Sequence, residues 1–270
     1  MPFPPPIEVA RQHESLLTDE IREVAFETRD WRLGVMGRTE PGVWMNSAYL
    51  DFRCEAERVT PDAIEEMASF YEERGIEPRV ELASYTPDET VRAIEAAGFR
   101  FGGFEHVLAA VPSKTASIEP PTGIELEWLD TDDAAAVERV VATAHTAFTG
   151  EPEPTEGHRE VSTRLVKASA TACLLAKRGR EIVGVSLLEV RGGVACLAFG
   201  ATLEAHRRFG AQRAMMLGRL RRAAELGCDV ATVGGRPGEG TERNAVRLGF
   251  APCFTRLSFT RPAKGLIASQ

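Results

Sequence analysis

The chain has 270 residues, of which 43% are hydrophobic and 27% charged, and its formal net charge is −8. These values are those of an ordinary soluble globular protein, and the length suits two domains. No apolar run approaches the roughly 18 residues that span a bilayer. The N-terminus also lacks the features of a secretory signal. We therefore expect a cytoplasmic protein with no membrane partner.

Charge and cysteine usage exclude further classes. Residues 1–117 carry 22 acidic and 12 basic side chains, whereas residues 118–270 carry 18 and 20. This basic excess is too small for a nucleic-acid binder. The five cysteines are an odd number without a C-x-x-C pair, so neither a disulfide framework nor a metal site is expected. The composition leaves a homodimer open.

Residues 1–111 predict a first domain that mixes helices and strands. Interspersed apolar positions predict a helix over 8–29, and Thr-Pro-Asp start signals predict helices over 60–74 and 86–98. The predicted strands are 31–36 and 43–52, joined as a hairpin, then 79–83 and 99–111. Residues 112–123 are rich in Pro, Ser and Thr and predict a linker.

Residues 124–262 predict a second domain, followed by a tail over 263–270. The predicted helices are 132–148, 159–167, a longer one that ends at Gly227, and 241–248. The predicted strands are 124–129, 172–177, 181–190, 194–201, 229–233 and 250–260. The segment 150–158 is rich in Pro and Gly and is expected to be irregular.

The stretch from Gly200 to Gly227 predicts the end of a strand, a turn and a helix of about five turns. The turn consists of Arg207, Arg208, Phe209, Gly210, Ala211 and Gln212. Gly210 has no Cβ, so a ligand can lie against its backbone. The first N–H groups of the helix have no intrahelical partner and point out of its positive end, which suits a pyrophosphate.

The helix that follows the turn has one apolar face. That face consists of Ala214, Leu217, Leu220 and Ala224. The basic residues expected to lie largely outside it are Arg213, Arg219, Arg221 and Arg222.

The two parts of the chain end alike. Residues 93–111 resemble residues 245–259, and Gly98-Phe99 matches Gly249-Phe250. Both parts also predict a hairpin, a helix, a strand, a helix and a strand in that order. We interpret this as a duplicated domain of the α/β class, with a twisted mixed sheet and helices on both faces of each copy.

The second part resembles the GNAT acyltransferase superfamily over about residues 120–262. The family's acyl-CoA signature is Gln or Arg, two residues, Gly, one residue, then Gly or Ala; Arg207 and Gly210 match it, and Gln212 departs from it. The segment 241–250, TERNAVRLGF, resembles the family's second cofactor element. The resemblance implies that Arg207, Arg208, Phe209, Gly210, Ala211 and Gln212 bind the pyrophosphate of acetyl-CoA, and that Ala201, Thr202, Leu203 and Asn244 bind its pantetheine arm.

The first part resembles a degenerate copy. At the position of the signature it reads CEAERVTPDAI (54–64), without glycine and with three acidic residues. We expect no acyl-CoA to bind there.

The resemblance implies an acetyl-CoA-dependent N-acetyltransferase in which the amine of a small molecule or peptide attacks the thioester directly in a ternary complex. Phe254 occupies the position where a proton-donating Tyr is common, so a non-catalytic acyl-CoA-binding or regulatory module is an alternative. The candidate bases are Glu151, Glu153, His145, His158 and Glu189, of which we select Glu151 and Glu189. Cys196 lies near the strand position that carries a Glu base in some relatives.

Overall fold

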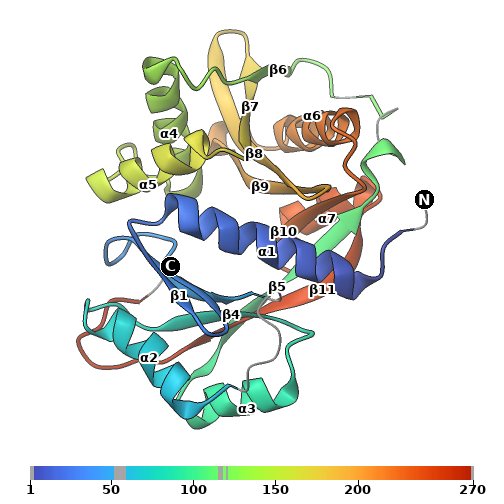
Figure 1. The fold of residues 1–270 in the computed structure, drawn as a ribbon. Helices are drawn as coiled ribbons and strands as arrows, with labels where there is room; N and C mark the ends of the chain where they lie inside the picture. The colour runs from blue at the N-terminus through green and yellow to red at the C-terminus, as the bar shows by residue number, and fades with distance from the viewer. Residues whose placement is uncertain (1–2, 52–58, 115–117, 120, 269–270) are drawn as a thin grey trace. The chain divides into compact units, whose positions relative to one another are not determined.

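The computed structural model describes residues 3–51, 59–114, 118–119 and 121–268 (Figure 1). The chain forms two units of mixed α/β structure. The C-terminal unit comprises Val107–Pro252 with Met1–Pro4, and the N-terminal unit comprises Pro5–His106 with Cys253–Gln270. No helix within the described ranges is long and apolar enough to cross a membrane.

The sheet of the C-terminal unit has the strand order β10-β9-β8-β7-β6. The strands are β6 (Glu125–Trp128), β7 (Thr171–Arg178), β8 (Glu181–Arg191), β9 (Val194–Thr202) and β10 (Val230–Gly235). Neighbouring strands are antiparallel except β9 and β10, which are parallel. A parallel pair needs a crossover connection, and here the crossover is the helix predicted after the turn.

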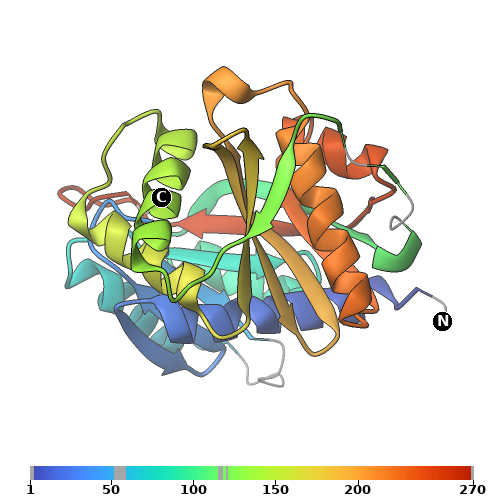
Figure 2. The same ribbon diagram turned by 90° about the horizontal axis from the view of Figure 1, so that it is seen from above.

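Helices cover both faces of this sheet. They are α4 (Ala134–Thr149), α5 (Glu156–Lys167), α6 (Ala211–Glu225) and α7 (Gly240–Arg247), and the short 3₁₀ turns are η1 (Pro112–Lys114) and η2 (Glu204–His206). Figure 2 shows α6 on one side of the strands and α4 with α5 on the other. Leu217 and Leu220 of α6 pack on Leu188 and Leu197 of the sheet, as the predicted apolar face requires.

The prediction that 150–158 is irregular is wrong at its end. Helix α5 already begins at Glu156, because the side chain of Thr155 accepts a hydrogen bond from the N–H of His158 and caps the helix. Threonine is a preferred N-cap residue, so Thr155 could have predicted the start of α5 from the sequence. The other helices of this unit begin and end within a few residues of their predicted bounds.

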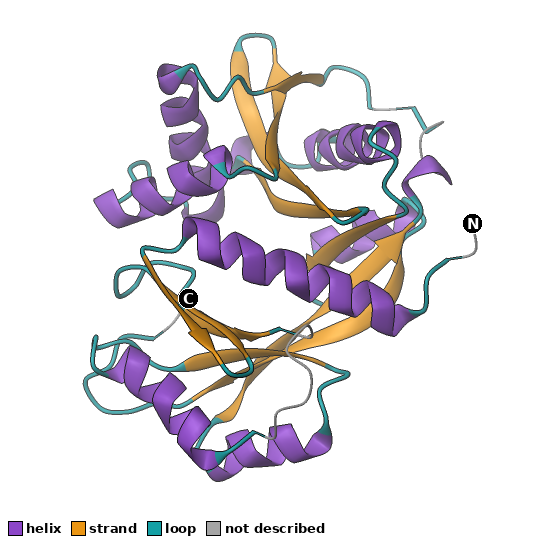
Figure 3. Cartoon of the chain, in the orientation of Figure 1, coloured by secondary structure: helices purple, strands orange, loops and turns teal. Residues whose placement is uncertain are grey.

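The N-terminal unit repeats this architecture (Figure 3). Its elements are α1 (Pro6–Val24), β1 (Glu27–Trp31), β2 (Gly34–Arg38), β3 (Ser47–Leu50), α2 (Pro61–Glu72), β4 (Arg79–Ala83), α3 (Asp88–Ala96), β5 (Arg100–Ala110) and β11 (Ala251–Thr260). The strand order is β1-β2-β3-β4-β11, and again the only parallel pair among these strands is the one that flanks a helix crossover, β3 with β4.

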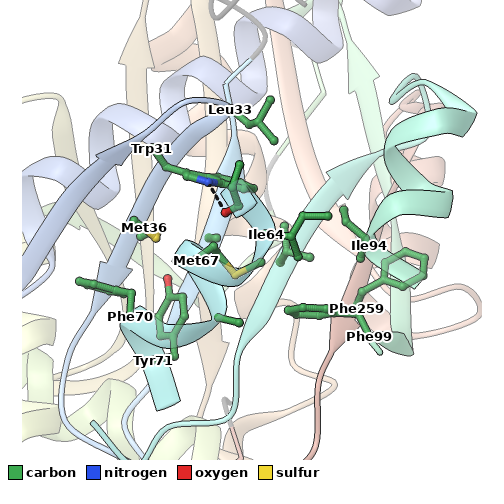
Figure 4. Packing of buried hydrophobic residues seen from close by; sticks show 14 of the residues in the cluster. Trp31, Leu33, Met36, Ile64, Met67, Phe70, Tyr71, Ile94, Phe99 and Phe259 are labelled. Atoms are coloured by element: carbon green, nitrogen blue, oxygen red, sulfur yellow. Dashed lines mark hydrogen bonds between the residues drawn. The ribbon is translucent and has the colours of Figure 1, made fainter. Parts of the chain in front are cut away.

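The predicted strand 31–36 is wrong, because the structure has the hairpin turn inside it. Trp31 at the end of β1 pairs with Gly34 at the start of β2. The Trp31 ring is buried, and its Nε1 donates a 2.8 Å hydrogen bond to the carbonyl of Ala63 (Figure 4). The polar run Glu27–Asp30 is an exposed outer strand, which sequence periodicity did not distinguish from the end of a helix.

Both parts of the chain share the order helix, three strands, helix, strand, helix, strand. The two units are nevertheless not continuous in sequence. Strand β5 has residues 100–106 in the N-terminal unit and 107–110 in the C-terminal unit, and residues 253–260 of β11 belong to the N-terminal unit. The predicted domains 1–111 and 124–262 with the linker 112–123 stay a prediction.

Candidate active site

The candidate site begins where β9 separates from β10. The parallel pairing of the two strands ends at Cys196 and Thr232, although β9 continues to Thr202. Its register with β8 shifts around Phe199, whose φ is 51°. A β-bulge of this kind bends a strand. The backbone over 197–202 therefore offers edge N–H and C=O groups to a ligand.

Arg219 of α6 donates hydrogen bonds to the backbone of the bulged strand β9 and of its neighbour β8. Its Nη1 donates to the carbonyls of Leu187 at 2.9 Å and Ala198 at 3.0 Å, and its Nε donates to Met215 at 3.2 Å. Burial lowers the pKa of Arg219 to about 10, so it stays protonated at neutral pH. The expectation that Arg219 lies outside the buried face of α6 is wrong, since it is only 2% exposed.

The turn before α6 has the geometry that its glycine predicts. Gly210 is the N-cap with a φ of 89°, a region that disfavours other residues. The first intrahelical bond runs from the N–H of Ala214 to the Gly210 carbonyl, so the N–H groups of 211–213 lie outside the helical ladder. A Cβ at position 210 would lie 2.7 Å from the Cβ of Pro121.

A cavity of 870 Å³ lies between this turn, the end of β9 and α7. Its volume is in the range of small-molecule and cofactor sites. The predicted cofactor residues that line it are Ala201, Thr202, Arg207, Arg208, Gly210, Ala211, Gln212 and Asn244. The lining residues that sequence reasoning did not select include Phe148, His206, Arg213, Thr241, Arg243 and Arg247. Of these, the arginines at positions 213, 243 and 247 could have been selected from the sequence, because basic side chains near the turn favour an anionic ligand.

Two predicted cofactor residues lie elsewhere. Leu203 lines a second cavity of 440 Å³ beside the C-terminal end of α4. Phe209 is 54% exposed, and the guanidinium carbon of Arg178 lies 4.5 Å from the centre of its ring. Phe209 therefore packs on the outside of the turn.

Arg207 connects the turn to α4. Its Nη2 donates to the carbonyl of Ala147 and its Nε to that of Thr202, both at 3.3 Å. Ala147 is in the last turn of α4, where carbonyls without intrahelical partners favour a cation. Arg207 thereby contributes positive charge to the cavity and holds its wall together.

Gln212, which departs from the family signature, turns toward α7. Its Nε2 donates to Oγ1 of Thr241 at 3.0 Å, and its Oε1 accepts from Nδ2 of Asn244 at 2.5 Å. The long side chain therefore crosses from α6 to α7 and does not block the helix N-terminus.

Two buried polar atoms of the cavity wall have no hydrogen-bond partner among the described residues. They are Oγ1 of Thr202 and Nδ1 of His206. The other ring nitrogen of His206 lies 3.3 Å from a carboxylate oxygen of Glu181. Buried polar atoms are normally satisfied, so the wall fits a ligand that carries hydrogen-bonding groups.

The two selected catalytic candidates have different surroundings. Glu189 of β8 is 2% exposed and directly opposite Cys196 of β9. Its neighbour Leu188 packs with α6, so by strand alternation Glu189 points to the face that α4 and α5 cover. Glu151 is exposed in the loop after α4, where its N–H donates to Thr149 Oγ1. Neither lines the 870 Å³ cavity.

The other base candidates cluster near α5. The rings of His145 and His158 have centroids 5.5 Å apart, and Glu153 lies 3.5 Å from a guanidinium nitrogen of Arg159. None of these three residues lines the 870 Å³ cavity.

Phe254, at the position where the family often has Tyr, belongs to the N-terminal unit. Its ring packs edge-on to the buried His13, with centroids 5.8 Å apart. The three tyrosines of the chain (Tyr49, Tyr71 and Tyr85) all precede residue 107. The C-terminal unit therefore has no phenol that could protonate a departing thiolate.

Comparisons with known proteins agree with this fold. The family model of the GNAT acetyltransferase domain matches residues 121–242. A GCN5-related N-acetyltransferase from Kribbella flavida superimposes with a TM-score of 0.69 at 18% identity, covering 97% of each chain. One from Sphaerobacter thermophilus gives 0.59 at 14% identity, covering 83% of this chain and 75% of the other.

A tandem GNAT protein from the clavulanic acid biosynthesis pathway also has this fold. It gives a TM-score of 0.59 at 11% identity, covering 85% of this chain and 78% of its own. No curated protein matches the chain. The fold similarity extends over both parts of the chain, and the family model matches the part that contains the cavity. Residues 121–242 therefore match the GNAT acetyltransferase domain, and the chain has the fold of tandem GNAT-like proteins.

Proposed function

We propose that the chain is an acetyl-CoA-dependent N-acetyltransferase that acts on a primary amine of a small molecule or peptide. The GNAT acetyltransferase fold supports acyl transfer from acetyl-CoA in general. The observation that carries the proposal is the 870 Å³ cavity, in which the N-terminus of α6, the free edge of β9 and Asn244 of α7 meet.

The residues of the cavity fit the chemical groups of acetyl-CoA in order. The N–H groups of 211–213 and the positive end of α6 suit the diphosphate. The edge of β9 at Ala201 and Thr202 and the amide of Asn244 suit the two amides of the pantetheine arm. Oγ1 of Thr202, buried without a partner among the described residues, is an additional hydrogen-bonding group.

When bound, acetyl-CoA supplies the activated acyl thioester, and the protein supplies orientation and proton transfer. The attacking amine must be neutral, which requires a base. We assign this role to Glu189, because it lies directly opposite Cys196, and Cys196 lies near the strand position that carries a Glu base in some relatives. Glu151, in the exposed loop after α4, would contact the acceptor. The thiolate leaves without a tyrosine donor from the C-terminal unit.

We also propose that the first part of the chain is a degenerate copy that binds no acyl-CoA. Its counterpart of α6 is α2, which begins at Pro61 and is capped by Oγ1 of Thr60, an acceptor for the N–H of Ala63. Proline has no N–H, and the cap occupies another donor. Asp62 in the first turn repels an anion. Residues 54–58 of the predicted counterpart turn lie outside the described residues.

Calorimetry with acetyl-CoA tests the proposal. We expect saturable binding by the wild type and none by Gly210→Glu, because the new carboxylate meets the diphosphate. Gly227→Glu is the control for a new carboxylate at a glycine of positive φ: it lies at the other end of α6, has a φ of 72° and has open space around its Cβ position, whereas position 210 faces Pro121. A melting curve for each variant confirms folding.

The experiment has three outcomes that differ from this expectation. Equal binding by the wild type and Gly210→Glu would put the acyl-CoA site elsewhere. No binding by the wild type would overturn the proposal. Binding without acetylation of any amine in a panel would favour the alternative, a non-catalytic acyl-CoA-binding module, for which the missing Tyr at position 254 is the supporting observation.

A further inference from the structure

Arg219 of α6 is a buried cation without a carboxylate partner among the described residues. The ionisable side chains that act on its charge are the thiols of Cys173 and Cys196, and its guanidinium donates to three backbone carbonyls. Burying a charge is costly unless the charge is paired, and an apolar side chain would fill the same position of the helix without that cost. Packing alone therefore does not account for an arginine here.

The carbonyls that Arg219 contacts lie at the bulge of β9. Leu187 of β8 and Ala198 of β9 are directly opposite each other, and Nη1 of Arg219 donates to both carbonyls. They form the pair beside the register shift, where two residues of β9 lie against one residue of β8. A Cβ at Gly200, within the bulge, would lie 3.7 Å from Nη2. One guanidinium therefore holds both strands at the point where their register changes.

The bulge continues into the wall of the 870 Å³ cavity, which Gly200, Ala201 and Thr202 line. Phe199 has a φ of 51°, a conformation that few residues other than glycine adopt. Such backbone persists only where the surrounding structure holds it in place. Because the N–H of a planar trans peptide points away from its C=O, a guanidinium that holds the Ala198 carbonyl also sets the direction of the N–H that follows it. A charged donor on the carbonyl polarises that peptide group as well.

We propose that Arg219 is a positioning residue for acyl transfer, which fixes the bulge of β9 so that its backbone N–H groups polarise the thioester carbonyl of bound acetyl-CoA. The inference rests on the proposed function. Attack by the amine nitrogen moves an electron pair of the C=O bond onto the oxygen. The pair returns as the C–S bond breaks, the thiolate leaves and the amine proton goes to the base.

Two effects of Arg219 favour this step. Donors that are already aimed at the oxygen stabilise the charge that develops on it, and a buried cation behind those donors adds to the stabilisation where the dielectric constant is low. Arg219 does not line the cavity, so it acts through the backbone of β9 and not by touching a substrate.

Infrared difference spectroscopy of acetyl-CoA labelled with carbon-13 at the acetyl carbonyl tests the proposal without an amine acceptor. For the wild type we expect the bound carbonyl to absorb at a lower wavenumber than free acetyl-CoA, because hydrogen-bond donors weaken the C=O bond. In Arg219→Gln the band should move back toward the free value, and Arg219→Lys, which keeps the charge but loses the fork of donors, should lie between. The Kd from calorimetry should stay within about twofold of the wild type, because the N-terminus of α6 is unchanged.

Leu165→Ala is the matched control for lost stability. Leu165 is a 2% exposed residue of α5, a helix whose main contacts are with α4 and β7. Its truncation should destabilise the same unit and leave the carbonyl band and the Kd unchanged. Melting curves measure the lost stability of each variant, and the calorimetric stoichiometry gives the fraction of protein that binds. A band that also returned to the free value in Leu165→Ala would indicate general loosening and would overturn the role of Arg219.

The remaining outcomes are distinct. A wild-type complex whose carbonyl absorbs like free acetyl-CoA would overturn the inference and leave the proposed acetyl-CoA site intact, and this measurement requires no variant to fold. A shift kept in full by Arg219→Gln would also overturn it, as would a loss of affinity in that variant without a change of the band. If acetyl-CoA did not bind to the wild type, the proposed function and the inference would fall together.

Discussion

The amide of Gln212 in the first turn of α6 accepts a 2.5 Å hydrogen bond from the amide of Asn244 in α7. An amide nitrogen carries two donors, so Asn244 keeps a second N–H for a ligand. The bond therefore orients the Asn244 side chain and uses only one of its two N–H donors. Where the family signature has a small residue, this chain has a side chain that fixes Asn244 of α7 against the first turn of α6.

We expect Gln212→Ala to weaken acetyl-CoA binding by about fivefold. The substitution removes the bond that orients Asn244, and a hydrogen bond of this kind contributes about 1 kcal/mol. The effect should appear in Kd and in KM for acetyl-CoA, whereas kcat should change less than twofold. Thr241→Val, which removes only the other partner of Gln212, should weaken binding by a smaller factor. Unchanged affinity in Gln212→Ala would show that this clamp has no role in binding.

Glu189→Gln should lower kcat by about 100-fold, the usual contribution of a general base. Because glutamine has the same shape, KM for acetyl-CoA should stay within about twofold of the wild type. Loss of the rising acidic limb of the pH–rate profile would assign the effect to proton transfer. Glu151→Gln should instead raise KM for the acceptor and leave kcat similar. A normal kcat in Glu189→Gln would exclude Glu189 as the base.

The secondary structure around the cavity was largely predictable because its signals are local. The glycine at position 210 predicted the turn, where the structure has a positive φ. The helical spacing of Leu217 and Leu220 predicted α6, in which both side chains are buried. Prediction failed where a side chain is satisfied by backbone far away in sequence. The guanidinium of Arg219 in α6 donates to carbonyls of the strands β8 and β9. The indole of Trp31 donates to the carbonyl of Ala63. No periodic pattern records such contacts.

The pairing partners of strands that are distant in sequence could not be predicted from local signals either. Residues 256–260 of β11 pair with residues 79–83 of β4, which lie far earlier in the chain. Strand propensity specifies that both segments are extended and does not specify their partners. For the same reason, the sequence did not show that the side chain of Gln212, which differs from the family signature, bonds to Thr241 and Asn244.

Arg219→Met should destabilise the C-terminal unit by about 3 kcal/mol. The substitution leaves the carbonyls of Leu187, Ala198 and Met215 without their guanidinium donor, at about 1 kcal/mol or more each. Urea unfolding followed by circular dichroism measures the change. Arg222→Met, an exposed arginine of the same helix, should stay within about 0.5 kcal/mol of the wild type. Equal stability of the two variants would mean that Arg219 is dispensable for the bulged strand.

His13 makes the stability of the N-terminal unit depend on pH. The residue is 2% exposed, and burial, aided by the charge of Arg256, lowers its pKa well below the ordinary value of 6.5. Just below pH 6.5 the unfolded chain takes up a proton that the folded chain does not. The free energy of unfolding therefore falls as the pH falls through this window, by at most about 1.4 kcal/mol per pH unit from this group.

His13→Gln should remove that contribution, so its unfolding free energy should fall less steeply than that of the wild type between pH 6.5 and 5. The slope is the readout, because the substitution also changes packing against Phe254 and shifts the whole curve. His145→Gln, at a half-buried histidine of α4, controls for the loss of a histidine as such. Parallel wild-type and His13→Gln curves would show that the folded chain protonates His13 as readily as the unfolded one.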